Sequence, residues 1–435
     1  MTQDRPNVLY IHSHDTGRYS QPYGHAIPMP AYQRFAEQGV LFRQNFCANP
    51  TCSPSRAALL TGQYPHSCGQ LGLAHRGFEL QHRERHLAWA LRNAGYSTTL
   101  IGVQHVVKNE PERIATTGYE HITTGGKAAQ VLPAALAFFE NVPQDKPFFL
   151  DVGFSETHRV FHEADPSLSP AEDARYCLPA APLPDTPETR KDMADFKASA
   201  RVLDAAVGQI LGALEAKGLA ENTLVILTTD HGIAFPEMKC NLTDHGIGVL
   251  LMLRGPGGLS GGKVVDAPVS HLDVFPTVCA VAGITPPGWL QGKSLVPLVS
   301  GEVTEIHEAI FAEVNYHAAY EPQRAVRTPR WKYIRRYDTY RTTVLPNCDN
   351  GYSKDVWLQH GWAERECAPE QLYDLIFDPV ERNNLADDPR YSGVLEEMRE
   401  RLLGWMRATD DPLLDGPVPV PEGAVVTPQE ALAPR

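Results

Sequence analysis

Residues 52–62 read Cys52-Ser-Pro-Ser-Arg56-Ala-Ala-Leu-Leu-Thr-Gly62, which places a thiol at the start of a short helix that ends at a glycine. A nucleophile at a helix N-terminus meets unpaired backbone N–H groups and the positive end of the helix dipole. Both favour an ionised nucleophile and an anionic substrate. Arg56, one turn later, can donate a forked pair of hydrogen bonds to the nucleophile or to its metal-bound form. The alternative is a buried helix-cap cysteine beside an ordinary surface arginine.

The same segment resembles the sulfatase signature C-x-P-S-R over eleven contiguous positions. In that family the cysteine is oxidised after translation to formylglycine, and the hydrated aldehyde supplies the nucleophilic oxygen. Pro54 and Arg56 match the positions needed for that conversion. The resemblance therefore implies that Cys52 is the catalytic residue, that Arg56 orients it, and that a formylglycine-generating enzyme is a maturation partner.

Short apolar runs alternate with amphipathic segments from the N-terminus to about Leu253, as in an α/β sheet with helices on its faces. Most of the runs are almost continuously hydrophobic, which is typical of buried central strands. The predicted strands are Val8–Ile11, Val40–Asn45, Thr98–Ile101, Phe148–Gly153, Thr223–Thr228 and Gly248–Leu253. The predicted helices are Met29–Gln38, Arg83–Ala94, Ala128–Glu140 and Met193–Lys217.

The residue pattern changes after the Pro/Gly-rich segment near residue 288. Aromatic and basic residues alternate there, as in Ala325–Tyr337, and a helix is predicted further on at Val394–Thr409. We expect a catalytic domain at 1–304, a smaller C-terminal α+β domain at 305–410 and an extended or disordered tail at 411–435. The family resemblance implies an alkaline phosphatase-like mixed sheet flanked by helices, with an antiparallel sheet in the smaller domain.

Two pairs, each of one aspartate and one histidine, follow predicted strands. They are His14-Asp15 and Asp230-His231. Both are expected at strand C-terminal ends, where α/β sheets bind ligands. Sulfatases hold a divalent ion at these places, so the resemblance implies a metal site that also includes Cys52. Calcium is the family expectation, but His14 stands where an aspartate is usual. Two imidazoles favour manganese, zinc or iron, whereas a lone histidine is more often a hydrogen-bonding partner than a ligand.

The segment that ends in Gly102-Val-Gln-His105 resembles a second family signature, in which a lysine stands at the position of Val103. His105 matches the signature and is expected to assist collapse of the covalent intermediate. The missing cation would normally contact the sulfate. Either Lys108 or Gln104 replaces it, or the substrate group carries less charge.

Four further residues complete the candidate site. His158 ends a strand-to-loop segment whose histidine contacts the substrate's bridging atom in sulfatases, so we expect it to protonate the leaving group. Lys239 matches the family lysine that holds the anion, although a solvated loop lysine is an equal alternative. His75 and His245 are candidates for substrate binding, and a turn role is as good an account of His245.

Composition excludes several classes of partner. The net charge is −13, from 39 basic and 52 acidic residues, which disfavours nucleic acid or a polybasic membrane module. The polar start and short apolar runs predict no signal peptide or membrane span, and we expect a cytoplasmic protein. Eight irregularly spaced cysteines do not form a disulfide or zinc pattern. A homo-oligomer remains open.

We therefore expect a hydrolase of a small sulfated anion, either a sulfate ester or a sulfamate. The segment around Cys52, Phe148–His158 and Gly232–Pro236 resembles the N-sulfoglucosamine sulfohydrolase branch of the sulfatases. One alternative is a phosphonate monoester or phosphodiester hydrolase on the same scaffold, which Val103 and His231 favour. The other is a catalytically silent sulfatase-like binding protein.

Overall fold

The computed structural model describes residues 5–143, 145–161 and 172–434. Residues 1–4, part of the polar start from which no signal peptide is expected, lie outside this range. Within the described residues, the strands of the central sheet are arranged in the order β5-β4-β6-β1-β7-β8-β2-β9. Their bounds are β1 Asn7–Ser13, β2 Val40–Phe42, β4 Ser97–Gly102, β5 His121–Thr123, β6 Phe148–Gly153, β7 Thr223–Thr229, β8 Leu251–Arg254 and β9 Lys263–Val265. The sheet is mixed, because β8 runs antiparallel to both β7 and β2.

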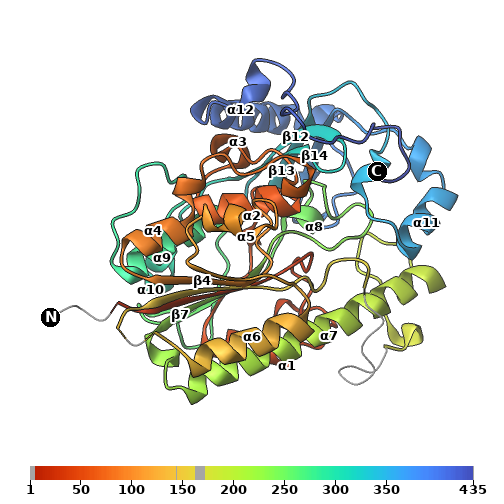
Figure 1. Cartoon of the computed structure of the whole chain (residues 1–435). Helices are drawn as coiled ribbons and strands as arrows, with labels where there is room; N and C mark the ends of the chain where they lie inside the picture. The colour runs from red at the N-terminus through yellow and green to blue at the C-terminus, as the bar shows by residue number, and fades with distance from the viewer. Residues whose placement is uncertain (1–4, 144, 162–171, 435) are drawn as a thin grey trace.

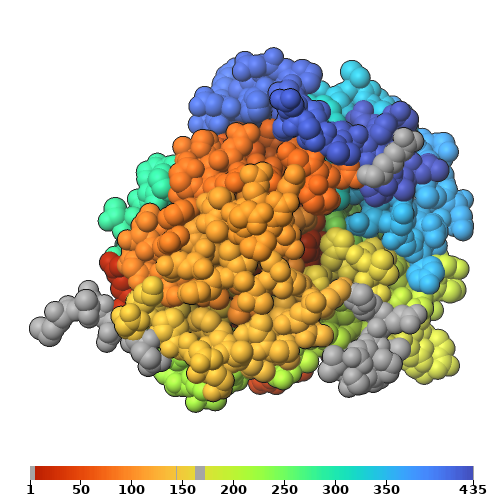
Figure 2. All heavy atoms as spheres, in the orientation of Figure 1, coloured from red at the N-terminus to blue at the C-terminus, as the bar shows by residue number. Residues whose placement is uncertain are grey.

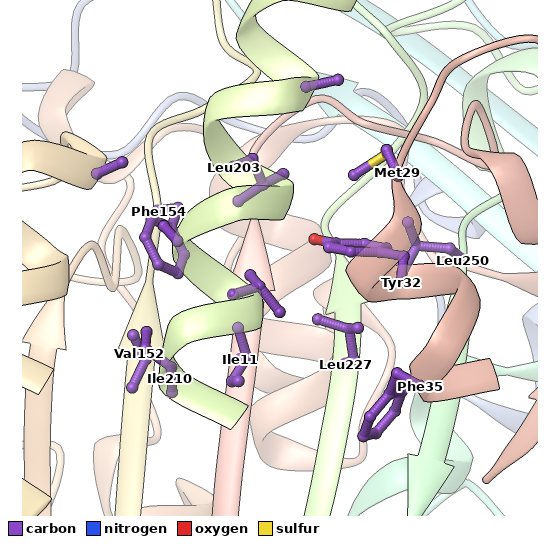
Figure 3. Packing of buried hydrophobic residues seen from close by; sticks show 14 of the residues in the cluster. Ile11, Met29, Tyr32, Phe35, Val152, Phe154, Leu203, Ile210, Leu227 and Leu250 are labelled. Carbon is purple, nitrogen blue, oxygen red and sulfur yellow. The ribbon is translucent and has the colours of Figure 1, made fainter. Parts of the chain in front are cut away.

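Strand β1 lies in the middle of the sheet and sends its side chains alternately to two hydrophobic cores. Leu9 and Ile11 pack on one face, whereas Val8 and Tyr10 pack on the other. Helices α1, α6 and α7 cover the first face, and α2, α4 and α9 cover the second (Figure 1). Figure 3 shows Ile11 packed beside Val152, Leu203 and Ile210 on the α7 side. These helices span Pro30–Gln38, Ala128–Glu140, Pro187–Ala216, Cys52–Thr61, Leu87–Asn93 and Val274–Ala282, in the order named.

The predicted elements are present, with some shifted bounds. Helix α7 begins at Pro187 instead of Met193, because Thr186 and Thr189 form a reciprocal capping box at its start. The predicted strand Val40–Asn45 is divided into β2 and β3, since β3 (Asn45–Phe46) leaves the central sheet to pair with β10 (Val269–Ser270). Strand β8 starts at Leu251, later than predicted. The short helices are α3 Pro65–Cys68, α5 Pro111–Ala115, α8 Asp244–Ile247 and α10 Val296–Ser300.

The C-terminal part contains an antiparallel sheet, as expected. Strands β11 (Ile310–Tyr316), β12 (Tyr320–Arg327), β13 (Trp331–Arg336) and β14 (Glu370–Asp374) lie in sequence order. Helix α12 (Ser392–Ala408) packs on β12 and β13, and α11 (Tyr352–Gln359) packs on α7. The mixed central sheet and this smaller sheet confirm the predicted fold class.

Figure 2 shows the last described residues, in dark blue, on the surface between orange residues of the N-terminal part and lighter blue residues of the C-terminal part. The Val425 amide donates to the Arg76 carbonyl, and the Thr427 amide donates to that of Ala318. Val418 is buried among C-terminal apolar residues. Among the described helices, none combines the length and the apolar character needed to cross a bilayer.

A buried ionic cluster joins the catalytic part to the C-terminal sheet. His66 of α3 contacts the carboxylate of Glu313 on β11, and its Nε2 lies 3.2 Å from the Thr409 carbonyl oxygen. Arg324 on β12 binds Asp411 in the same cluster. Although burial opposes protonation, Glu313 raises the pKa of His66 above its ordinary value of 6.5.

We predict that this cluster makes stability depend on pH. A raised histidine pKa adds stability that is complete below about pH 6.5 and is lost as the pH rises through the folded-state value. His66→Gln should lower the free energy of unfolding by about 1.5–3 kcal/mol at pH 6, the usual worth of a charged hydrogen bond, and by less at pH 9. Urea titrations of both proteins at the two pH values measure this, and an equal loss at both would contradict it.

Candidate active site

The two predicted metal pairs meet at one edge of the central sheet. His14 and Asp15 follow β1, Asp230 and His231 follow the adjacent strand β7, and Cys52 is the first residue of α2. All five side chains are buried, and one ligand atom from each lies within 4.8 Å of all the others. The sequence placed these residues correctly because the carboxyl ends of neighbouring parallel strands share an edge.

Each histidine of this cluster brings one ring nitrogen close to the carboxylates. His231 Nδ1 donates to the Gly232 carbonyl oxygen at 2.9 Å, which leaves the lone pair on Nε2. This Nε2 atom lies 3.2 Å from Asp15 Oδ1 and 3.3 Å from Cys52 Sγ. His14 Nδ1 lies 3.0 Å from Asp15 Oδ1 and 3.1 Å from Asp230 Oδ2. The donor set therefore fits a divalent ion.

The backbone around Asp15 is held in an uncommon conformation. Asp15 has a φ of +54°, in the left-handed region that side chains other than glycine seldom adopt. Its amide donates to Asp230 Oδ1 at 2.8 Å, and the His231 amide donates to the same oxygen at 2.9 Å. These bonds hold the Asp230 carboxylate against the backbone of Asp15 and His231, and a strained φ of this kind is typical of functional sites.

Arg56 is buried beside the cluster, so the interpretation of Arg56 as an ordinary surface residue is wrong. Its Nη2 donates to Asp230 Oδ2 at 2.9 Å and to the Ser13 carbonyl oxygen at 3.0 Å, and its Nη1 donates to His12 Nδ1. The Nε atom has no hydrogen-bond partner among the described residues. Arg56 therefore binds the metal-site carboxylate directly.

Helix α2 starts at Cys52 and is followed by Gly62, which caps it with a φ of +65°, so the glycine ends the helix as the sequence predicts. The groups around Cys52 nevertheless oppose ionisation of the thiol itself. Burial, together with Asp15 and Asp230, raises the pKa of Cys52 well above its usual range, and Lys239 and Arg56 offset this only in part. The nucleophile that the helix N-terminus favours is therefore expected to be the modified residue rather than the thiol.

Lys239 is almost completely buried, so the solvated-loop alternative is wrong. Its ammonium lies 2.9 Å from Asp15 Oδ2, 2.9 Å from Asp349 Oδ2 and 3.5 Å from His158 Nε2. Burial alone would lower its pKa, but Asp15 and Asp349 raise it well above the ordinary value. Conversely, burial opposes ionisation of Asp15, yet Lys239, His158 and His231 hold the pKa of Asp15 well below its usual range.

A cavity of about 330 Å³ opens beside the cluster, and several predicted residues line it, namely His14, His75, Val103, His105, Lys108 and His158. His75 Nδ1 lies 3.0 Å from His105 Nε2, and the two rings are stacked. His105 has a φ of +63°, and burial lowers its pKa well below the ordinary value. His158 Nδ1 donates to the Arg159 carbonyl oxygen, and its other ring nitrogen, Nε2, lies 3.5 Å from Lys239 Nζ.

Two predicted candidates have other partners. The Gln104 amide is used within its own turn, where Oε1 accepts from the Val106 and Val107 amides and Nε2 donates to the Val107 carbonyl. His245, on α8, has its Nδ1 3.0 Å from the Tyr19 hydroxyl, and it is not among the residues of the metal cluster or the cavity. The sequence could not show that these two residues have other partners. A residue that is close to site residues along the chain can still bond to its own backbone or to a side chain outside the site.

The sequence analysis missed three residues near the site. Asp349, in the C-terminal part, forms an ion pair with Lys239. It lies in an irregular polar stretch of the sequence whose residue pattern predicted no helix or strand. Lys127, at the start of α6, lines the cavity close to Val103. His12 lies within the apolar run of β1, and a polar residue inside a buried strand was the signal that could have revealed it.

Comparison with known proteins gives the family. The Sulfatase family model matches residues 6–284, and a model described as N-sulphoglucosamine sulphohydrolase, C-terminal, matches residues 238–350. The chain belongs to the sulfatase family. Human N-sulphoglucosamine sulphohydrolase is 30% identical over 94% of this chain and 92% of its own length. An ulvan-active sulfatase of Formosa agariphila is 26% identical over 94% of this chain and 76% of its own length. The resemblance inferred from the sequence is confirmed, and the protein is a sulfatase-family hydrolase.

Solved structures share the fold of this sulfatase. A 2-O GAG sulfatase superposes with a TM-score of 0.73 at 23% identity, covering 95% of this chain and 94% of the other. Phosphonate monoester hydrolase of Agrobacterium radiobacter superposes with a TM-score of 0.70 at 23% identity, covering 98% of this chain and all of the other. At these identities the likeness establishes the architecture alone.

Proposed function

We propose that this sulfatase hydrolyses a small sulfate ester or sulfamate, with Cys52 as the precursor of a formylglycine nucleophile. The proposal is supported chiefly by the buried group of His14, Asp15, Asp230 and His231 around Cys52. Formylglycine, when hydrated, supplies a nucleophilic oxygen, and a divalent ion bound by this group supplies positive charge for an anionic reaction. The two imidazoles favour manganese, zinc or iron over calcium.

The residues around Cys52 bind and orient the reacting groups. Arg56 donates a hydrogen bond to the Asp230 carboxylate, and the Lys239 ammonium forms an ion pair with the Asp15 carboxylate. Lys108 and Lys127 line the cavity and bring positive charge to the side where Val103 carries none. An anionic substrate that enters this cavity is therefore drawn toward the nucleophile despite the protein's negative net charge.

His158 is the proposed proton donor to the leaving group. Its side chain is about one third exposed and lines the cavity, so a departing oxygen or nitrogen can reach Nε2. Asp15 Oδ2 lies 3.8 Å from this atom, and a histidine in such a place is a candidate general acid. His105, stacked on His75 across the cavity, is proposed to assist release of the second product.

Parallel kinetics test this function. An aryl sulfate, an N-sulfated amino sugar and an aryl phosphonate monoester are assayed with the same enzyme preparation, and kcat/KM is measured for each. We expect the sulfated compounds to be preferred by at least about 100-fold, or about 2.7 kcal/mol in transition-state stabilisation. The identity to a sulphoglucosamine sulphohydrolase makes the N-sulfated sugar the first compound to test.

The phosphonate hydrolase is the second candidate, because it is favoured by His231 and by Val103, which stands at the position of the signature lysine. A preference for the phosphonate would replace the proposed function with that activity. Turnover of none of the three compounds by fully converted, metal-loaded enzyme would contradict both and favour a binding protein.

A further inference from the structure

A line of buried polar side chains runs below the metal cluster, on the α2 face of the central sheet. It consists of Tyr119, Asp151, His12 and Arg56, in this order, and each side chain is 3% exposed or less. The Tyr119 hydroxyl donates to Asp151 Oδ2, and His12 Nε2 lies 2.9 Å from Asp151 Oδ1. Arg56 Nη1 contacts His12 Nδ1 at the other end. We call these four residues the His12 chain.

The direction of each hydrogen bond follows from the chemistry of the groups. A guanidinium only donates, so His12 Nδ1 accepts from Arg56 and carries no proton. The imidazole proton is then on Nε2, and it donates to the Asp151 carboxylate. Asp151 also accepts from Tyr119, so its two oxygens are both used. The chain therefore fixes one tautomer of His12 and one orientation of its ring.

The surrounding strands make room for His12. In the parallel pair of β1 and β6, Tyr10 is the partner of Asp151 and His12 is the partner of Gly153. A Cβ on Gly153 would lie 2.5 Å from His12 Cε1, so only glycine leaves space for the imidazole. An apolar pair at positions 12 and 151 would suit this core at least as well in free energy, because buried charged groups lose their hydration. Stability alone does not account for the chain.

We propose that His12, held by Asp151, is a positioning residue for Arg56. The inference rests on the proposed function, since Arg56 acts there by holding Asp230. Nη2 of Arg56 is held by Asp230 and by the Ser13 carbonyl, and His12 provides the acceptor for Nη1. Without that acceptor, Nη1 becomes a buried donor with one partner fewer and the planar group is free to turn about its long side chain. The Asp230 carboxylate then loses its fixed donor.

The experiment compares three variants with the wild type. His12→Leu/Asp151→Leu replaces the central pair by apolar residues and leaves no unpaired carboxylate. His12→Asn keeps an acceptor near the position of Nδ1. His86→Asn is the matched control, because His86 is also buried and packs against Tyr119, and asparagine retains the helix-capping acceptor that His86 provides to α4. For each protein we measure formylglycine content, thermal unfolding, and kcat and KM for the sulfated compound that the wild type turns over.

We expect the double variant to fold, with kcat lowered about 10–100-fold, the usual effect of losing a residue that orients a ligand-binding group. KM should change less than about threefold, because the lost interaction acts on the nucleophile side. His12→Asn should recover at least about half of the lost activity on a logarithmic scale, and the control should match the wild type. A purely structural role would instead lower the unfolding temperature without this split between kcat and KM.

A second readout does not depend on turnover. In ¹⁵N-histidine-labelled protein, His12 should show a protonated Nε2 and a bare Nδ1, and the Arg56 Nη protons should be protected from exchange in the wild type and in His12→Asn but not in the double variant. An Nδ1-protonated His12, unprotected Arg56 protons in the wild type, or an unchanged kcat in a folded double variant would overturn the inference. If the double variant does not fold, His12→Asn and single His12→Leu are compared by the same measurements. If the wild type turns over no sulfated compound, the proposed function fails while the spectra still test the chain.

Discussion

Cys52→Ala should abolish turnover of sulfated substrates, with kcat lowered by about 10³-fold or more, as expected when the nucleophile of a catalytic unit is removed. The alanine side chain fits the buried start of α2, so the variant should fold as the wild type does. The measurement is the initial rate on the preferred substrate, combined with mass spectrometry of the peptide that spans residue 52, on protein co-expressed with a formylglycine-generating enzyme.

Cys47→Ala is the control for this variant. Cys47 is also a buried thiol close in sequence, and it donates to the Asn49 carbonyl. We expect it to keep nearly full activity. Full turnover by Cys52→Ala would refute the proposed mechanism. An unmodified Cys52 in active wild-type protein would instead indicate a metal-dependent hydrolase that uses another nucleophile.

Changing the metal ligands should change which ion supports activity. Chelation of the wild type should remove activity, and manganese, zinc or iron should restore it better than calcium, because two of the four protein side chains beside Cys52 are imidazoles. His14→Asp/His231→Asn replaces both with oxygen donors, which calcium prefers. The ratio of calcium affinity to zinc affinity should then rise by at least about 100-fold, given that even outer ligand partners change metal affinity 10–100-fold.

Calorimetric titration of each ion into the chelated proteins gives these affinities directly. Lys108→Gln is the control, since Lys108 lines the cavity and is not one of the clustered metal donors. It should weaken substrate binding and leave the metal preference unchanged. A wild type that binds calcium more tightly than zinc would show that His14 and His231 are not both ligands.

The sequence predicted the sheet, and it predicted that the two Asp/His pairs lie together at one edge of it, for physical reasons. Buried parallel strands are continuous apolar runs, and polar residues that follow them gather at one edge, as His14, Asp15, Asp230 and His231 do. The predicted ends of helices were less accurate where polar residues extend a helix, as at the start of α7, which Thr186 caps.

Contacts between distant segments could not be predicted. Asp349 follows Lys239 by more than a hundred residues, and its position depends on how the C-terminal sheet folds back onto the site. The raised pKa of the Cys52 thiol has the same origin. The helix N-terminus favours a thiolate, but burial and two carboxylates brought from other strands outweigh it.

The burial of α2 also has a consequence for the order of events during biosynthesis. All ten residues of the helix are buried, and Cys52 lies beneath the strand ends that carry Asp15 and His231. An enzyme that binds the chain around Cys52 can reach it only before α2 is buried, so we predict that the proposed conversion to formylglycine precedes folding. In that case a molecule that folds first keeps its thiol, and the active fraction of a preparation depends on whether modification or folding comes first during synthesis.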